Sequence, residues 1–302
     1  MEWCSTGLRR DQSFRLGVSQ IVRKRCGLFG EAVRERVREA EEDLKGVELF
    51  DLKGRVAVIA GGTTGLGREI ALGLAGAGAD VVASARRQQQ VDSIATEIEA
   101  LRRRTLRITS DVLNRASIQR LHDAVIEAFG KVDILVNAAG LTKKVATLEL
   151  DEGDWSKIIE TNLTGTMRAC QIFGRTMAKA GYGRIINIAS VTAFRGFYRV
   201  APYAASKSAV ASLTKTLAVE LAQTGVNVNA IAPGVFPSDM SKPLVIGTPR
   251  GEEILMRTPM HRFGDPKEII GPAIFLASEA AAFVTGEVIA VDGGYLASGV
   301  NC

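Results

Sequence analysis

The sequence predicts an α/β fold, a doubly wound parallel sheet in a single domain that follows an N-terminal extension. From about residue 50 onward, short apolar segments alternate with segments of helical composition, and no low-complexity linker separates them. No repeat of solenoid period is present. Strands and helices that alternate in this way form parallel sheets with helices on both faces.

Seven strands are expected, because seven short segments are nearly continuously apolar or β-branched, as buried parallel strands are. One of them, Ile185-Ile-Asn-Ile-Ala-Ser190, ends in a hydroxyl residue at the point where open α/β sheets place their ligands. In chain order the expected strands are Arg55–Ala60, Asp80–Ala85, Leu106–Thr109, Val132–Asn137, Ile185–Ser190, Val226–Ile231 and Val288–Val291.

Six helices are expected between these strands, since the intervening segments have helical spacing or composition. After the second strand, for example, Val91, Ile94 and Ile98 fall on one helical face. The expected helices are Arg68–Gly76, Val91–Leu101, Arg115–Phe129, Trp155–Ala180, Tyr203–Ala222 and Pro266–Leu276.

The first 47 residues differ in composition from the rest of the chain. Their first part is rich in arginine and has no secretory apolar region, and Glu31–Asp43 predicts a charged helix. This start resembles an organelle transit peptide, and the alternative is a non-catalytic appendage from an upstream start codon. We therefore interpret residues 1–47 as an N-terminal extension and residues 48–302 as the folded domain.

The composition argues against several other classes of protein. The 4 cysteines are scattered without C-x-x-C spacing, which indicates a reducing, cytoplasmic compartment and no zinc site or disulfide framework. His122 and His261 are far apart, so neither a metal site nor a Ser-His-Asp triad is expected. Much of the arginine excess behind the net charge of +5 lies near the N-terminus, so no nucleic-acid partner is expected. No apolar run reaches the ~18 to 20 residues of a membrane span.

A glycine-rich turn follows the first strand, with the sequence Gly61-Gly-Thr-Thr-Gly-Leu-Gly67. Glycines between a strand and a helix let the backbone approach the pyrophosphate of a dinucleotide, whose charge lies at the helix N-terminus. The spacing departs from G-x-G-x-x-G, so a glycine turn without a ligand is the alternative.

The end of the second strand indicates which dinucleotide would bind. An NAD site places an acid there, but Asp80 lies at the opposite end of its strand and the segment ends in Arg86 and Arg87. Two guanidinium groups can hold a 2′-phosphate, so NADP is expected in preference to NAD. The alternative is that both arginines are solvated residues at the entry of a helix.

Tyr203 and Lys207 lie one helical turn apart, on the same face of the expected helix. An adjacent ammonium favours the phenolate and would lower the pKa of Tyr203 from about 10. With Ser190 arriving from the neighbouring strand, this trio could move a proton to or from a substrate oxygen. The alternative is that Tyr203 and Lys207 are half-buried surface residues.

Taken in order, the motifs resemble the short-chain dehydrogenase/reductase family over about Leu49–Val300. Each motif alone is weak or moderate, whereas the ordered set is specific. The matching segments are Gly61-x-x-x-Gly65-Leu66-Gly67, Asp111-Val112, Asn137-Ala-Ala-Gly140, Asn162, Ser190, Tyr203-x-x-x-Lys207, Pro233-Gly234 and Val291-Asp-Gly-Gly294. The resemblance implies a Rossmann fold, with residues 48–302 as the NADP-binding catalytic domain.

The resemblance also implies roles for individual residues. Tyr203 would be the general acid/base, and Lys207 would bind the nicotinamide ribose and lower the pKa of Tyr203. Ser190 would orient the substrate oxygen, and Asn162 would hold a water of the proton relay. Asp111 would face the adenine. The remaining cofactor contacts implied are Gly61, Thr63, Thr64, Gly65, Leu66, Gly67, Val112, Asn137, Ala138, Gly140, Pro233, Gly234 and Ser238. Ala60 and Ala138 depart from the family's usual Thr and Asn, and Pro237-Ser238 alters the start of the lid.

Several strings most resemble the gluconate 5-dehydrogenase and 3-oxoacyl-carrier-protein reductase branch, among them Phe50–Arg55 and Arg262–Gly264. In the family's layout, Val191–Pro202 and a lid at about Val235–Met260 would face the substrate. Cations beside aromatic rings in the first segment suit an anionic or polyhydroxylated substrate, or they are solvated loop residues. The candidates are Arg195, Phe197, Tyr198 and Arg199, with Lys143 and Lys144 nearby.

The expected function is an NADP(H)-dependent interconversion of a secondary alcohol and a ketone, with gluconate/5-ketogluconate as the first substrate and a 3-oxoacyl thioester as the alternative. A non-catalytic NADP-binding regulator is the competing hypothesis from another class. By analogy with the family, a homodimer or homotetramer is expected through the helices of Trp155 and Tyr203.

Overall fold

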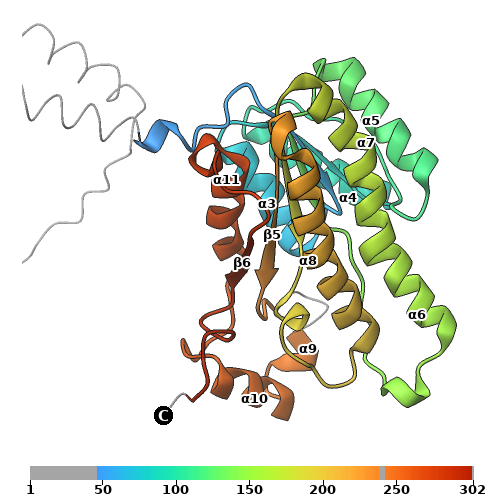
Figure 1. Cartoon of the computed structure of the whole chain (residues 1–302), viewed down its shortest axis with the longest axis vertical. Coiled ribbons are helices and arrows are strands. Elements are labelled where there is room, and N and C mark those ends of the chain that lie inside the picture. Colours follow the sequence, from blue (N-terminus) through green and yellow to red (C-terminus); the bar gives the residue numbers. More distant parts are fainter. Residues whose placement is uncertain (1–45, 238–241, 301–302) are drawn as a thin grey trace, which may run out of the picture. The chain divides into compact units, whose positions relative to one another are not determined.

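The computed structural model describes residues 46–237 and 242–300 (Figure 1). The chain divides into two compact units, residues 1–49 and residues 50–302. The described part of the first unit is residues 46–49, of which 46–48 form a helical turn. The expectations for residues 1–45 lie outside the described residues.

One sheet of six parallel strands runs through the second unit, in the order β2-β1-β3-β4-β5-β6. The parallel α/β fold is thereby confirmed, with six strands instead of seven. The strands are β1 (Val56–Ala60), β2 (Asp80–Ser84), β3 (Ile134–Asn137), β4 (Gly183–Ile188), β5 (Val226–Pro233) and β6 (Val288–Val291).

The strand expected at Leu106–Thr109 is wrong. The residues on either side of this segment make two backbone hydrogen bonds with the β2 side of the sheet, from Val81 N to Arg104 O and from Ser110 N to Ala85 O, both 3.0 Å long. Between these points the Ser84 hydroxyl donates to Ile108 O at 2.7 Å. Because a side chain takes the place of a backbone partner, the segment forms no continuous ladder with β2.

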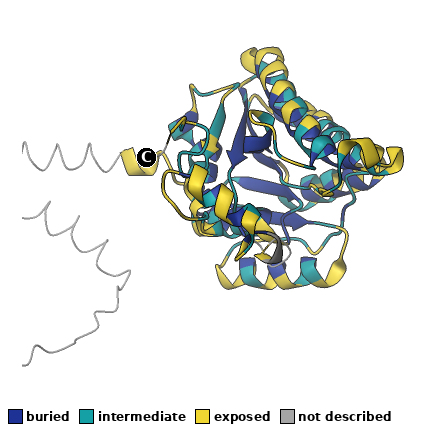
Figure 2. Ribbon diagram, turned by 90° about the horizontal axis from the view of Figure 1, so that it is seen from below, coloured by how far each residue is buried: buried dark blue, intermediate teal, exposed yellow. Residues whose placement is uncertain are grey.

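Helices cover both faces of the sheet, and the strand residues alternate between the two cores. Helices α3, α4 and α11 enclose one core, to which Ala57 and Ile59 of β1 belong, whereas α5, α7 and α8 enclose the core of Val56 and Val58 (Figure 1). The helices are α3 (Gly65–Gly76), α4 (Gln88–Ala100), α5 (Arg115–Phe129), α6 (Glu152–Ile159), α7 (Gly165–Ala180), α8 (Ala201–Leu221), α9 (Lys242–Val245), α10 (Pro249–Arg257) and α11 (Ile270–Ala277). Figure 2 shows the buried strands between helices whose outer faces are exposed.

The helix expected over Trp155–Ala180 begins earlier and is interrupted. Asp151 caps α6 by accepting hydrogen bonds from Gly153 N and Asp154 N. A π-helical turn at Glu160–Thr164 then joins α6 to α7. Such turns insert one extra residue and are frequent at functional sites.

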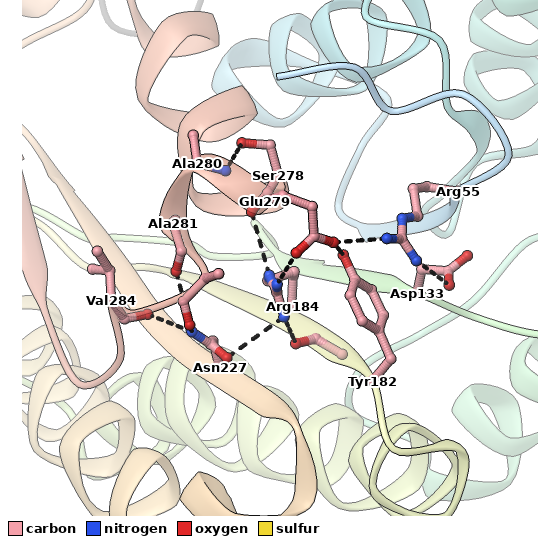
Figure 3. A network of polar contacts seen from close by, with 12 residues as sticks. Arg55, Asp133, Tyr182, Arg184, Asn227, Ser278, Glu279, Ala280, Ala281 and Val284 are labelled. Atoms are coloured by element: carbon pink, nitrogen blue, oxygen red, sulfur yellow. Dashed lines mark hydrogen bonds and ion pairs between the residues drawn. The ribbon is translucent and has the colours of Figure 1, made fainter. Parts of the chain in front are cut away.

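At the amino-terminal edge of the sheet, Glu279 connects strands that lie apart in the sequence (Figure 3). Its carboxylate accepts hydrogen bonds from Arg55 Nη2 at 2.7 Å and from Arg184 Nη2 at 3.1 Å. The Tyr182 hydroxyl donates to the same carboxylate at 2.9 Å. Arg184 is only 4% exposed, so this ion pair is buried on the arginine side. The group fixes the starts of β1 and β4 against the turn that follows α11.

Candidate active site

The residues expected to act gather at the carboxyl-terminal edge of the sheet. Ser190 lies two residues beyond β4, Asn137 and Pro233 close β3 and β5, and Gly61 directly follows β1. Because all the strands are parallel, these ends share one edge, where open α/β sheets bind their ligands. Helix α8 brings Tyr203 and Lys207 to the same edge, since Lys207 Nζ donates to the carbonyl of Ile188, the last residue of β4, at 2.6 Å.

Asn162 lies in the π-helical turn and is fully buried. Its Oδ1 accepts from Leu141 N at 2.9 Å, and its Nδ2 donates to Leu141 O and to Ser206 Oγ, both at 3.0 Å. The side chain therefore ties the loop after β3 to helix α8. A Cβ on Gly140 would lie 3.4 Å from Asn162 Oδ1 and 3.6 Å from Lys207 Nζ, which places this glycine beside both groups.

Lys207 is a buried cation. It is 4% exposed, and desolvation lowers the pKa of its ammonium to about 8. Below that pH the ammonium remains the main form.

Tyr203 has a raised pKa, because burial disfavours its phenolate, and a hydrogen bond with the Ser190 side chain only partly opposes this shift. The expected lowering by Lys207 is therefore wrong in this structure. Lys207 Nζ lies 5.7 Å from the centroid of the phenol ring and donates its hydrogen bond to Ile188 O. The phenol thus keeps its proton at neutral pH.

The glycine turn needs two of its glycines for its own packing. Gly61 has a φ of +84°, and a Cβ there would lie 2.5 Å from Ala139 N. A Cβ on Gly67 would lie 2.2 Å from Gly61 O. Neither position accepts a larger residue without moving backbone, so the first turn of α3 packs closely against β1.

The entry of α3 has the properties that a dinucleotide phosphate requires. Gly65 has a φ of +55° and borders open space. Thr64 makes no side-chain cap, and the first turn of α3 contains no acid, so its backbone N–H groups can face an anion. Thr63 is buried and donates to Gln90 Oε1 at 3.3 Å, Thr64 is exposed, and Leu66 packs against the core. The residues present therefore fit a pyrophosphate.

Arg86 and Arg87 follow β2 and are exposed. Neither guanidinium has an acidic partner among the residues described. The hydrogen bond from Ser110 N to Ala85 O brings Asp111 and Val112 beside this strand end. Asp111 Oδ1 accepts from Leu113 N at 3.0 Å.

Asn137 points away from the expected cofactor contact. Its amide donates to Asn187 Oδ1 at 2.9 Å and to Cys170 Sγ at 3.3 Å, inside the sheet. Ala138 N donates to Ala60 O at 2.9 Å, and Gly234 N donates to Val291 O at 2.9 Å, so both lie on the sheet edge. Ser238 lies outside the described residues.

The candidate substrate residues differ in their surroundings. Arg195 is exposed, and the Tyr198 side chain is 77% exposed. Phe197 packs on Tyr295 with 5.6 Å between ring centroids, and Arg199 is partly buried. Outside this segment, Lys144 is exposed and Lys143 is paired with Asp154. Phe197 and Arg199 are thus partly enclosed, whereas Arg195 and Tyr198 are exposed.

Sequence reasoning did not single out three residues that lie in this segment or contact it. The amide of Thr192 donates to Ser190 Oγ at 3.2 Å. Arg250 Nη1 donates to Tyr198 O at 3.3 Å, and the ring of Tyr295 covers Phe197. The position of Thr192 two residues after Ser190 was a usable signal. Arg250 and Tyr295 reach the segment only through tertiary folding.

Within the described ranges, no group of three His, Cys, Asp or Glu side chains could hold a metal ion. The helices of the same ranges include none that is long and apolar enough to cross a membrane.

Comparisons with known proteins agree on the family of this chain. A family model described as Enoyl-(Acyl carrier protein) reductase matches residues 60–296. The 2-dehydro-3-deoxy-D-gluconate 5-dehydrogenase of Dickeya dadantii (strain 3937) is 42% identical over 249 residues, which are 82% of this chain and 98% of that protein. A 3-oxoacyl-[acyl-carrier-protein] reductase of Synechocystis sp. is 38% identical over 245 residues, or 80% of this chain and 97% of that protein.

A solved structure extends the agreement to the fold. The gluconate 5-dehydrogenase from Burkholderia cenocepacia J2315, in complex with NADP and tartrate, superimposes with a TM-score of 0.80. It is 35% identical, and the alignment covers 83% of this chain and 98% of that one. The chain therefore belongs to the short-chain dehydrogenase/reductase family and is an oxidoreductase that acts on hydroxyl groups.

Proposed function

We propose that the protein is an NADP(H)-dependent oxidoreductase that interconverts the alcohol and ketone forms of a sugar acid of the gluconate/5-ketogluconate kind. The observation that carries this proposal is the meeting of Ser190, Tyr203 and Lys207 at the sheet edge that also holds the glycine turn. We assign the activity to residues 48–302.

Bound at the glycine turn, the dinucleotide would supply or accept the hydride. Tyr203 Oη donates its proton to the carbonyl oxygen during reduction, and the Ser190 hydroxyl holds the same oxygen in place. The raised pKa of Tyr203 keeps this proton available at neutral pH. Lys207 offers its ammonium to the ribose, and Asn162 holds the loop at Leu141 and helix α8 in register. At neutral pH Tyr203 can therefore act as the acid in reduction of the ketone.

The two reaction directions should differ in their dependence on pH. Both need the Lys207 ammonium, whose pKa is about 8, to bind the ribose, and reduction also needs the protonated phenol, so kcat/KM for the ketone should fall above about pH 8. Oxidation needs a phenolate, so the ratio of its kcat/KM to that of reduction should rise with pH toward the raised pKa of Tyr203. Initial rates between pH 6 and 10 in both directions measure this. Parallel profiles in the two directions would contradict the assignment of Tyr203.

Arg86 is proposed to bind the 2′-phosphate of NADP. Its exposed position after β2 supports this, as does the absence of an acidic partner among the described residues. Arg86→Ala should weaken NADPH binding about tenfold or more and leave NADH binding nearly unchanged, because only the former loses a charge-assisted hydrogen bond. Fluorescence titration of both cofactors tests it, with Arg120→Ala on the exposed side of α5 as the control. Equal weakening of both cofactors would refute the role.

The relatives support an anionic substrate. Dehydrogenases named for gluconate or 2-dehydro-3-deoxy-D-gluconate recur among them, and one is in complex with tartrate, a hydroxy acid. The second candidate, reduction of a 3-oxoacyl thioester, is favoured by the reductase of Synechocystis sp.. A panel of 5-ketogluconate, 2-dehydro-3-deoxy-D-gluconate and a 3-oxoacyl thioester, assayed with NADPH and NADH, decides between them. Absence of turnover with every ketone would reject the proposal.

We further propose a homodimer or homotetramer that uses α6 and α8. Val219 on α8 is 80% exposed and Trp155 on α6 is 40% exposed, which suits a contact with a second copy. Sedimentation at micromolar concentration tests this, and a monomer would refute it.

A further inference from the structure

A chain of buried hydrogen bonds joins helix α8 to strand β4. Asn187 Nδ2 donates to Thr214 Oγ1 at 2.9 Å, and the Thr214 hydroxyl donates in turn to Val210 O, within its own helix, at 2.8 Å. On the other side, Asn187 Oδ1 accepts from Asn137 Nδ2 at 2.9 Å. Asn187 and Thr214 are both 0% exposed. Because hydrogen bonds are directional and a buried polar group is costly to leave unpaired, this network permits few relative positions of the two elements.

The apolar packing of α8 defines its position less strictly. Beyond the first turn, the buried apolar residues of this helix are Val210, Ala211 and Ala218, which are small. The leucines of α8 are only partly buried. Small side chains form shallow ridges, so the polar contacts of α8 are what mainly restricts its sliding and rotation on the sheet.

The same two elements carry the groups that meet at the active site. Ser190 follows Asn187 by three residues on the segment that continues β4, and Tyr203 precedes Thr214 by eleven residues on α8. Eleven residues are about three helical turns, so Tyr203 and Thr214 lie on one face of the helix, about 16 Å apart along its axis. Between them, Lys207 donates to the last residue of β4. With the strand and the helix each rigid, the bond at Thr214 sets where Tyr203 lies relative to Ser190.

We propose that Asn187 and Thr214 are positioning residues of the reaction, an inference that rests on the proposed function. Their hydrogen bond holds α8 at one height on β4, and at that height the Tyr203 hydroxyl bonds with the Ser190 side chain. Neither residue contacts the reacting atoms. A displacement of about 1 Å in a reacting group can lower a rate about 10²-fold. A slight shift of α8 would therefore lower the activity while every catalytic side chain remained present.

Thr214→Val and Thr214→Ser separate the hydroxyl of this residue from its packing. Valine keeps the shape of threonine and removes the acceptor of Asn187, whereas serine keeps the acceptor and removes a methyl group. With NADPH and a ketone that the parent reduces, Thr214→Val should lower kcat about tenfold to a hundredfold and leave KM for the ketone nearly unchanged. Thr214→Ser should retain most of the activity.

Thr96→Val on α4 is the matched control and should be as active as the parent. Thr96 is exposed, and its hydroxyl makes the same kind of bond within its own helix, to Asp92 O at 3.0 Å. Melting temperatures of all variants are measured beside kcat. Activities that follow the melting temperatures, or a loss of kcat in Thr214→Ser as large as in Thr214→Val, would overturn the proposal, because the hydroxyl would then only stabilise the fold.

A second comparison starts from the strand side. In an Asn187→Ala background the bond is already absent, so adding Thr214→Val should lower kcat no further. An additional loss of kcat in the double variant would contradict the proposal, since Thr214 would then act through another partner.

Hydrogen exchange tests the same contact without turnover. In Thr214→Val, the amides of residues 205–208 in the second turn of α8 should exchange about fivefold faster or more than in the parent, with exchange in α4 unchanged. Thr214→Ser should exchange as the parent does. Faster exchange confined to the turn around residue 214 would refute the positioning of Tyr203. A parent protein that reduces no ketone rejects the proposed function, whereas the exchange rates still decide whether Thr214 holds the start of α8.

Discussion

Replacing Tyr203 by Phe should lower kcat about 10²- to 10⁴-fold, the range that general acid–base catalysis contributes. The variant keeps the ring that packs at the entry of α8 and loses only the hydroxyl that bonds with Ser190. The ketone and the cofactor could still bind in the positions that hydride transfer needs, but the carbonyl oxygen would have no proton donor. Stopped-flow or steady-state oxidation of NADPH in the presence of a reducible ketone measures the effect.

Two controls make this result specific. NADPH affinity should be unchanged in Tyr203→Phe, which shows that the site is still folded. Tyr182→Phe makes the same chemical change at the opposite edge of the sheet, where the hydroxyl donates to Glu279 at 2.9 Å. Tyr182→Phe should lower the free energy of unfolding by about 1 kcal/mol and leave the activity unchanged. Activity of Tyr203→Phe equal to that of the parent would remove Tyr203 from the mechanism.

Replacing Glu279 by Ala should lower the free energy of unfolding by about 3 kcal/mol, because it leaves the buried guanidinium of Arg184 without its counter-ion. Arg184 is 4% exposed and retains hydrogen bonds to Ser278 O and Gly183 O, but these acceptors carry no net charge (Figure 3). Arg55 and Tyr182 would lose the same acceptor. This loss is at the lower end of what breaking a buried ion pair costs, since the Glu279 side chain is 42% exposed.

Thermal and denaturant unfolding measure this loss, which corresponds to a decrease in Tm of roughly 6–12 °C for a domain of this size. Glu99→Ala is the matched control, because Glu99 also pairs with an arginine through two hydrogen bonds, but Arg107 is 42% exposed. Exposed pairs contribute little to stability, because water screens their attraction. A similar loss in both variants would mean that burial of Arg184 is not the cause.

The parts of this fold that depend on local pattern could be predicted from the sequence. Strands such as Val56–Ala60 are apolar on both faces, and the one-turn spacing of Tyr203 and Lys207 follows from helix geometry alone. The segment at Leu106–Thr109 has the composition of a strand, but beside the edge strand β2 its Ile108 carbonyl accepts from the Ser84 side chain and no continuous ladder forms, which the composition does not reveal. In the π-helical turn, Asn162 bonds to Leu141 and Ser206 of other elements, and the spacing of apolar residues in the sequence does not reveal these partners.

The electrostatics of the site were the least predictable part. The sequence places a cation one turn from Tyr203, and this spacing predicts a lowered pKa. In the folded protein, burial raises the pKa of Tyr203 instead, and the Lys207 ammonium donates its hydrogen bond to Ile188 O. The unpartnered Nε of Arg199 likewise exists only after the chain has closed around it. Both properties arise from which atoms lose water, and a sequence does not specify that.

The π-helical turn at Glu160–Thr164 limits how this part of the chain can change in length. Removing one residue there would restore an ordinary α-helix and rotate the preceding helix by about 100° relative to the following one. Either Ile158 would leave the core, where it is 1% exposed, or Asn162 would turn its amide away from Leu141. Homologous chains should therefore conserve the number of residues across this stretch more strictly than their identity, and engineered deletions should be tolerated in neighbouring loops instead.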